Sequence, residues 1–302
     1  MTARPTIATE LALLVLLSTL WGASYTFIKL GVATIPPLTL IASRTLIAGL
    51  VLAAMLRARG LAWPRDAATW RRFLSQACLN SVIPFTLIAW AEQAVDAGLA
   101  TILNSTSPIF AFLLTALVTR HEIVTMRKLV GVAAGLVGVC LLVGVEALHG
   151  LGDVVWSQLA IVAATICYAG AAIYGKGFKG LDSMLPAAGS LLAGTALLLP
   201  AALVIDRPWT LAPSATSLQA LLALAIVSTA LALVIYFRLV QTLGSVGATA
   251  QSYLRVPIGV AIGVLALGER LSPTAWLGLG CVLAGVIAMT LPARKTVTAA
   301  AS

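Results

Sequence analysis

The chain has 302 residues, of which 60% are hydrophobic and 10% are charged, and its mean hydropathy is +1.04. Soluble domains are about 45–50% apolar and about 25% charged, so this composition excludes an ordinary soluble protein and indicates a membrane protein. The net charge of +9 then reflects the enrichment of lysine and arginine in cytoplasmic loops, not binding of nucleic acid.

Ten apolar runs follow one another, each close to the roughly 20 residues that a transmembrane helix needs. The first five are Leu11–Leu30, Leu38–Leu56, Phe73–Trp90, Leu99–Val118 and Leu129–Val145. The second five are Val155–Tyr174, Leu185–Ile205, Leu218–Leu239, Val246–Leu267 and Thr274–Leu291. The first run continues past Ser24, so we interpret it as a retained span and not as a signal peptide. The sequence predicts an all-α polytopic membrane protein with ten transmembrane helices.

The second half of the chain repeats the first. Ala91–Val139 resembles Leu239–Ile287 in order, and Trp21 falls on Tyr168 at an offset of 147 residues (168 − 21) that also aligns other residues near the start of each half. Weakly similar apolar halves are typical of transporters built from repeats. We therefore predict two five-helix repeats, residues 1–148 and 149–302, around a central cavity.

The distribution of basic residues predicts the orientation. With the N-terminus inside, fourteen lysines and arginines fall on the inner side, whereas only Lys29, Arg207 and Arg270 fall on the outer side. Basic residues concentrate on the cytoplasmic side, so we expect both termini there. Five spans per half is an odd number, which means that the two repeats insert in opposite directions and are inverted.

Prolines inside the spans predict breaks, because proline offers no N–H to the carbonyl four residues earlier. Pro108 frees the carbonyl of Asn104 in the fourth span, and Pro257 frees that of Tyr253 at the related position of the ninth. Interrupted helices at corresponding positions indicate a transporter's binding site. Pro84 predicts a third break, in the third span. The alternative is a plain kink absorbed by packing.

Polar and aromatic side chains gather around these breaks. An arginine at the centre of a span costs about 2.5–3.5 kcal/mol on insertion scales, so it usually faces a cavity or a partner. We interpret Arg255 as a cavity cation suited to a carboxylate or phosphate, and Arg44 as a second such cation or a structural residue. The predicted substrate-binding residues are Trp21, Ser24, Arg44, Asn80, Asn104, Tyr168, Gln251, Tyr253 and Arg255.

Several motifs are missing. There is no G-x-x-x-x-G-K-[ST] phosphate loop, so we expect no direct use of ATP. His121 and His149 both lie in loops, and we expect neither a metal site nor another cofactor. None of the ten acidic residues lies in the middle of a predicted span, and Glu92 and Glu269, for example, lie at helix ends. Intramembrane carboxylates are the usual proton relay, so we expect transport without protonation of a side chain in the spans.

Four short motifs resemble the drug/metabolite transporter superfamily, specifically its EamA-type members. They are Leu20–Ser24, Pro37–Arg44, Thr119–Thr125 and Leu267–Ser272, the last close to the family's gly-glu-arg turn. The resemblance covers about residues 11–291 and is strongest to YddG-type bacterial amino-acid exporters. It implies two inverted five-helix halves, a central cavity and alternating access without ATP. The first-half turn departs from the pattern, since it carries over only Glu122.

The leading interpretation is a secondary transporter, not an enzyme, that exports amino acids and related small metabolites across a bacterial inner membrane. One alternative is a carrier for phosphorylated or other anionic metabolites or drugs, which more than one cavity cation would favour. Another, of a different class, is a membrane scaffold or sensor without flux. The expected partners are the small-molecule substrate and the lipid bilayer, with no nucleic acid, and the protein is a monomer or a homodimer.

Overall fold

A computed structural model of the chain describes residues 7–114, 126–143, 153–178, 180–236, 238–239 and 251–290, and within these residues all regular structure is helical. The α-helices are α1 (Ile7–Val32), α2 (Pro37–Ala58), α3 (Ala67–Ala77), α4 (Ile83–Ala91), α5 (Ala97–Asn104), α6 (Ser107–Leu114), α7 (Met126–Val143), α8 (Asp153–Gly175), α9 (Met184–Ile205), α10 (Ala215–Leu222), α12 (Gln251–Leu267) and α13 (Pro273–Thr290). The same described residues also form two π-helical segments, η1 (Cys78–Val82) and η6 (Ala223–Leu231), and two 3₁₀ turns, η4 (Lys176–Phe178) and η5 (Pro208–Thr210).

Within the described residues, seven helical stretches are long and apolar enough to cross a membrane. They are Ala8–Val32, Pro37–Ala58, Ala67–Ala91, Ala97–Leu114, Val154–Gly175, Met184–Ile205 and Ala215–Tyr236. Three shorter apolar helices, Leu129–Leu141, Leu254–Leu267 and Pro273–Gly285, lie where the fifth, ninth and tenth spans were predicted. The all-helical membrane architecture is therefore confirmed, and the count of ten spans stays a prediction.

The helix ends follow local rules. Pro37 begins α2, where its missing N–H costs nothing because the first N–H groups of a helix have no partner inside it. Asp66 caps α3 by accepting a hydrogen bond from the backbone N–H of Thr69 at 2.7 Å, and Ser214 caps α10 through Ser217 at 3.1 Å. These caps place the ends of the apolar runs in short polar connections.

The interruptions differ in part from the prediction. The fourth span is broken, since α5 ends at Asn104 and α6 begins at Ser107. Ahead of Pro84, the third span passes through the π-helical η1. The prediction of a matched break in the ninth span was wrong, because α12 continues through Pro257. A proline removes only one hydrogen bond, and the packing around a helix can absorb the kink.

A second pair of matched irregularities was not predicted. Shifting η1 by the repeat offset of 147 residues places it on residues 225–229, which lie inside η6 (Ala223–Leu231). A π-helical segment widens the helix by one residue per turn and redirects the side chains that follow it, and such segments often occur at functional sites. Both segments supply residues to the cavity described below.

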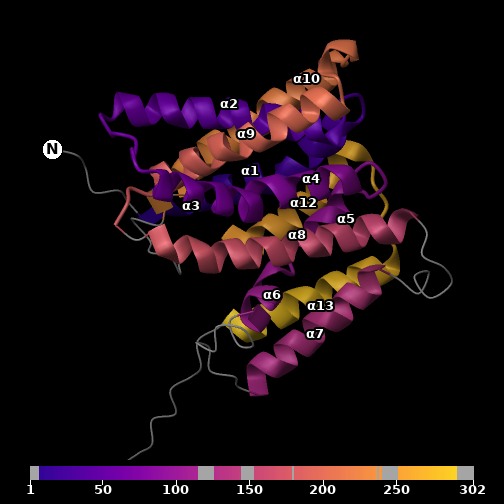
Figure 1. Ribbon diagram of the computed structural model, residues 1–302. Coiled ribbons are helices and arrows are strands. Elements are labelled where there is room, and N and C mark those ends of the chain that lie inside the picture. The colour runs from indigo at the N-terminus through magenta and orange to yellow at the C-terminus, as the bar shows by residue number, and fades with distance from the viewer. Residues whose placement is uncertain are drawn as a thin grey trace, which may run out of the picture.

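The helices form three groups (Figure 1). At one edge α2 packs along α9, and at the opposite edge α7 packs along α13. Between them lie α1, α4, α5, α8 and α12, where α1 packs against α12 and α4 against α8. Ile102, Ile161 and Val256 are fully buried in this middle group, whereas Val204 and Leu265 are exposed on the outside, as expected for side chains that face lipid.

Glycines allow the closest helix crossings. A Cβ on Gly285 of α13 would come within 2.5 Å of the carbonyl oxygen of Gly131 on α7. A Cβ on Gly22 of α1 would lie 3.1 Å from both the carbonyl oxygen of Arg255 and the amide nitrogen of Gly259 on α12. Small residues at such positions let backbones approach in membranes, where packing drives association. The second crossing also fixes the position of Arg255 beside α1.

Candidate substrate cavity

A cavity of about 750 Å³ lies inside the helix bundle. This volume falls in the range of about 300–1,000 Å³ that is usual for small-molecule sites. Its walls include parts of α1, α2, α3, α4, α8, α9 and α12, both π-helical segments, and the α5–α6 break. Its lining includes Trp21, Ser24, Tyr25, Ile28, Arg44, Gln76, Asn80, Phe85, Ile88, Asn104, Ser107, Tyr168, Ser190, Ser228, Thr229, Tyr236, Gln251 and Arg255.

The cavity brings together eight of the nine substrate-binding residues predicted from the sequence. These eight are Trp21, Ser24, Arg44, Asn80, Asn104, Tyr168, Gln251 and Arg255. The side chain of the ninth, Tyr253, lies outside the described residues. Whether these residues bind a solute stays a prediction, but the fold places them around one space.

Arg44 is held on two sides. Its Nε donates a hydrogen bond to the hydroxyl of Thr229 at 3.0 Å, and its guanidinium carbon lies 3.8 Å from the centroid of the Phe85 ring. The Thr229 hydroxyl in turn donates to the carbonyl of Leu224, five residues earlier, at 2.8 Å. The π-helical turn of η6 therefore orients the residue that holds Arg44. The arginine is 6% exposed.

Arg255 is less constrained. It lies on α12 next to the crossing with Gly22 and is half-buried. Its Nε is buried and has no hydrogen-bond partner in the part of the chain that the structure describes. Leaving a charged donor unsatisfied is costly, so the guanidinium is suited to a bound acceptor in the cavity. A planar guanidinium binds a carboxylate or phosphate through two parallel hydrogen bonds.

Aromatic rings form two walls. The Trp21 and Tyr236 rings pack with centroids 5.5 Å apart and planes tilted by 41°. Phe85 and Tyr168 meet edge to face at 6.4 Å. Because Arg44 lies over Phe85, the second wall carries a cation on one ring and a phenol on the other. Such walls can bound an apolar side chain and also accept a cation on a ring face.

Oxygen acceptors line the remaining surface. The side-chain Oδ1 of Asn104 is buried with no hydrogen-bond partner among the residues that the structure describes, and so are the hydroxyls of Ser190 and Ser228. The backbone carbonyl of Asn104, freed by Pro108, already accepts a hydrogen bond from the Ser107 hydroxyl at 2.9 Å. The break therefore contributes the Asn104 amide to the cavity, while a neighbouring hydroxyl occupies one acceptor position of the freed carbonyl.

The charged side chains that line the cavity within the described residues are all positive. Among the lining residues that the structure describes, Arg44 and Arg255 are cations and no aspartate or glutamate is present. In surroundings of low dielectric constant, two unbalanced cations attract an anionic group strongly. Of the solutes considered above, those with a carboxylate or phosphate fit this lining.

Within the described residues, the cavity reaches the surface at one end, which we call the mouth. There it is lined by Gly175, Leu181 and Ser183, from the end of α8 and the connection to α9, and Leu181 is exposed. At the other end, which we call the closed end, Ile28 and Ile88 are each 2% exposed. Within the described residues, the lining is thus exposed at the mouth and buried at the closed end.

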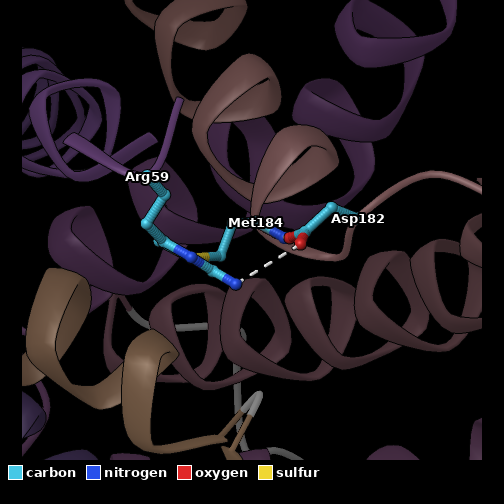
Figure 2. A network of polar contacts seen from close by, with 3 residues as sticks. All are labelled: Arg59, Asp182 and Met184. Atoms are coloured by element: carbon cyan, nitrogen blue, oxygen red, sulfur yellow. Dashed lines mark hydrogen bonds and ion pairs between the residues drawn. The ribbon is translucent and has the colours of Figure 1, made fainter. Parts of the chain in front are cut away.

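Contacts beside the mouth tie α2 to the start of α9 (Figure 2). Nη2 of Arg59 lies 3.7 Å from Oδ2 of Asp182, and its Nη1 lies 2.7 Å from the Met184 sulfur. Oδ1 of Asp182 also accepts a hydrogen bond from the Met184 backbone N–H at 2.9 Å. Arg59 is half exposed at 51%, so this ion pair contributes little energy and can open readily.

Two ionic residues clasp the connection between α4 and α5 at the closed end. The ammonium of Lys29 donates to the backbone carbonyls of Glu92 and Val95, each at 2.8 Å. The carboxylate of Glu269 accepts from the backbone N–H of Ala97 at 2.7 Å and of Gly98 at 2.8 Å. We call Lys29 and Glu269 the clasp. Each neutralises the helix end of opposite polarity, the C-terminus of α4 and the N-terminus of α5.

Sequence reasoning missed several lining residues. Gln76, Ser190 and Thr229 lie in runs of mostly apolar residues and follow no break that a proline marks. The repeat offers one signal, because Ser228 is the counterpart of Ser81 at the offset of 147 residues (228 − 81). Both serines are buried in π-helical segments. Comparing the polar residues of the two halves would have found Ser228, but not Gln76.

Similar proteins include several transporters. The chain is 29% identical over 274 residues to the uncharacterized inner membrane transporter YedA of Escherichia coli (strain K12), covering 90% of this chain and 87% of that protein. It is 27% identical to a probable terminal-alkyne amino-acid exporter of Streptantibioticus cattleyicolor, covering 91% of each. A probable amino-acid metabolite efflux pump of Escherichia coli (strain K12) is also 27% identical, covering 91% and 92%.

The fold is also known from experiment. A chain in a solved crystal structure superposes with a TM-score of 0.65 at 17% sequence identity, covering 96% of this chain and 100% of that one. The model of the EamA-like transporter family matches residues 9–144 and matches again over residues 155–291. These two matches span nearly all of the helices and confirm the family that the short motifs resembled. The chain is a multi-pass membrane protein that belongs to the EamA-like transporter family.

Proposed function

We propose that the protein is a secondary transporter that exports amino acids and related small metabolites across a bacterial inner membrane. The observation that carries this proposal is a 750 Å³ cavity inside a membrane helix bundle that opens at its mouth and is shut at its closed end. An alternating-access carrier passes through such a state and its reverse. The names of two similar proteins, which refer to amino-acid export, support the substrate class.

The cavity offers partners for each part of an amino acid. Arg255, whose Nε is unsatisfied, binds the carboxylate. The unpaired Oδ1 of Asn104 and the nearby Asn80 and Gln251 provide acceptors for the ammonium. Trp21 and Tyr168 bound the volume left for the side chain. An aromatic boundary limits size but makes few directional demands, so we expect broad specificity.

The architecture of the proposal is two inverted five-helix repeats, residues 1–148 and 149–302, with both termini cytoplasmic. The two successive family matches and the excess of basic residues on one side support it. In this orientation the cavity mouth lies on the cytoplasmic side. The substrate gradient would then drive export without ATP, and rigid-body rocking of the two halves would move the opening of the cavity from one side to the other.

A second candidate is a carrier for phosphorylated or other anionic metabolites or drugs. The observation that favours it is the pair of arginines in a described lining without a carboxylate. A zwitterion brings no net charge and leaves the net charge of this pair at +2, whereas a dianion compensates both charges. A scaffold or sensor without flux has no such observation behind it.

The deciding experiment is uptake by the purified protein in liposomes. A panel of radiolabelled amino acids is compared with organic phosphates and other organic anions of similar size. Flux of amino acids above protein-free liposomes supports the first proposal, and flux confined to the anions supports the second. Specific binding without flux of any compound would contradict both and favour a sensor.

A further inference from the structure

The carboxyl group of Glu92 has an unusual environment. Glu92 lies one residue beyond the span Ala67–Ala91, at the closed end of the cavity, and is 0% exposed. Among the described residues, neither of its carboxylate oxygens has a hydrogen-bond partner. The two clasp residues on either side do not satisfy it, because Lys29 donates to backbone carbonyls and Glu269 is itself an acceptor. An ionised carboxylate buried without a donor is strongly disfavoured.

The charged and titratable groups around Glu92 come from three elements. Lys29 and Tyr25 lie on α1, Arg44 lies on α2, and Glu269 lies in the connection between α12 and α13. Burial raises the pKa of the Glu92 carboxyl well above its usual range; Lys29 and Arg44 oppose this shift, and the negative charge of Glu269 adds to it. Burial without a hydrogen-bond donor thus favours the neutral acid in this closed arrangement.

We propose that Glu92 is a proton-binding site and that closing this end of the cavity takes up a proton there. When the end opens, water reaches the carboxyl, which releases its proton to that water and becomes ionised. When the end closes, a proton from the same water bonds to one carboxylate oxygen before the group is buried. No other bond forms or breaks.

The clasp supplies the structural response. With Glu92 neutral, Lys29 is available to the backbone carbonyls of Glu92 and Val95, as observed at 2.8 Å. Once Glu92 is ionised, its carboxylate competes for the same ammonium as a stronger acceptor. Lys29 then leaves the carbonyls of Glu92 and Val95, and of the two clasp residues Glu269 is the one that still holds the connection to α5. Loss of the proton thus weakens the closed end, and gain of the proton restores it.

This inference rests on the proposed function, because a closed end matters only to a protein whose cavity changes sides. It also bears on the expectation that transport proceeds without protonation of a side chain in the spans. That expectation was based on position along the chain, and Glu92 does lie at a helix end, but the fold buries it. A carrier whose two states differ by one bound proton responds to a pH gradient.

Infrared spectroscopy tests the bound proton directly. The purified protein in liposomes is titrated with pH, and the carbonyl band of protonated carboxyls is followed. We expect a band that persists at neutral pH, disappears in Glu92→Gln, and shifts in frequency in Glu92→Asp. The matched control is Asp96→Asn, which removes an exposed carboxyl from the same connection. A band at neutral pH that is unchanged in both Glu92 variants would overturn the proposal.

A labelling experiment tests the link to closure. Val95, which is 2% exposed in the closed end, is replaced by cysteine after the four native cysteines are replaced by alanine. Its reaction rate with a membrane-impermeant maleimide is compared with that of the same protein carrying Glu92→Gln, which cancels the thiol's own pH dependence. The measured quantity is the labelling rate with Glu92 present divided by the rate with Glu92→Gln. If closure takes up one proton, this ratio rises by up to about tenfold per pH unit above about pH 4.3.

The ratio rises with pH because the closed form binds one more proton than the open form, so its population falls as the pH rises. Asp96→Asn should leave the rise intact, and a ratio that is constant with pH would overturn the coupling. Neither measurement uses a substrate. An absence of flux for every compound tested would therefore contradict the proposed function while leaving the proton site separately testable.

Discussion

The two cavity arginines have different surroundings, and their substitutions should therefore have different effects. Arg44 donates to Thr229 and stacks on Phe85, so protein groups already use its charge. Arg255 has an unsatisfied Nε. The first arrangement is typical of a residue that shapes a site, and the second of one that binds what enters it.

Arg255→Ala should weaken transport of carboxylate substrates without changing thermal stability. Losing a charge-assisted hydrogen bond costs about 1.5–3 kcal/mol, which is roughly 10- to 150-fold in affinity. Arg255→Lys should recover only part of the loss, because lysine keeps the charge but not the planar fork. The measurement is substrate concentration dependence of flux in liposomes, with the exposed Arg270→Ala as a control. Normal transport by Arg255→Ala would show that the arginine is structural.

Arg44→Ala should lower the thermal unfolding temperature as well as transport. The substitution leaves the Thr229 hydroxyl without its donor and removes the cation from the Phe85 ring, which together cost about 2–4 kcal/mol. Arg44→Lys keeps the interaction of a cation with the Phe85 ring, so its unfolding temperature should lie between those of the native protein and Arg44→Ala. Thermal unfolding followed by intrinsic fluorescence in detergent decides this. An unfolding temperature equal to that of the native protein would make Arg44 a ligand-binding residue only.

At the scale of elements, the pairing of α7 with α13 depends on glycines that leave no room for a side chain. Gly285→Ala would place a Cβ 2.5 Å from the Gly131 carbonyl oxygen and 2.8 Å from the Gly135 amide nitrogen. Backbone atoms cannot move aside as a flexible side chain can, so the helices must separate. We expect a lower unfolding temperature, because a separation here loses contacts along the whole pair.

A matched control lies on the same helix. A Cβ on Gly280 would meet no atom of a neighbouring element within 4 Å, so Gly280→Ala adds a methyl group in open space. Alanine is favoured over glycine in a helix by about 1 kcal/mol, and the variant should be as stable as the native protein or slightly more so. Equal destabilisation by Gly280→Ala and Gly285→Ala would contradict the packing explanation and indicate a general intolerance of α13.

At the scale of the whole molecule, the distribution of basic residues predicts the topology. Reporter fusions after Asp96, Asp153 and Asp206 should read periplasmic, and fusions after Arg65 and Lys179 should read cytoplasmic. Basic residues near the ends of spans resist translocation, which is the physical reason. A cytoplasmic reading after Asp153 would remove the inverted repeat, and with it the proposed mechanism of alternating access.

Much of this architecture could be predicted from the sequence, because its determinants are local. An apolar run of about 20 residues has to form a helix in lipid, where every backbone N–H needs a partner within the segment. The short motifs and the duplication indicated the family, and the two family matches confirmed it. Eight predicted residues meet in one cavity because deep polar residues are costly in lipid and turn inward.

The tertiary structure alone decided what each polar residue touches. Proline at 257 predicted a break, yet α12 continues through it, since neighbouring helices determine whether a kink opens. The π-helical turn that lets Thr229 reach Arg44 leaves no pattern in the residues of η6. Glu92 reads as an ordinary residue at the end of a span, but α1, α2 and the α12–α13 connection enclose it. Burial depends on segments far apart in the chain, so position along the sequence could not reveal it.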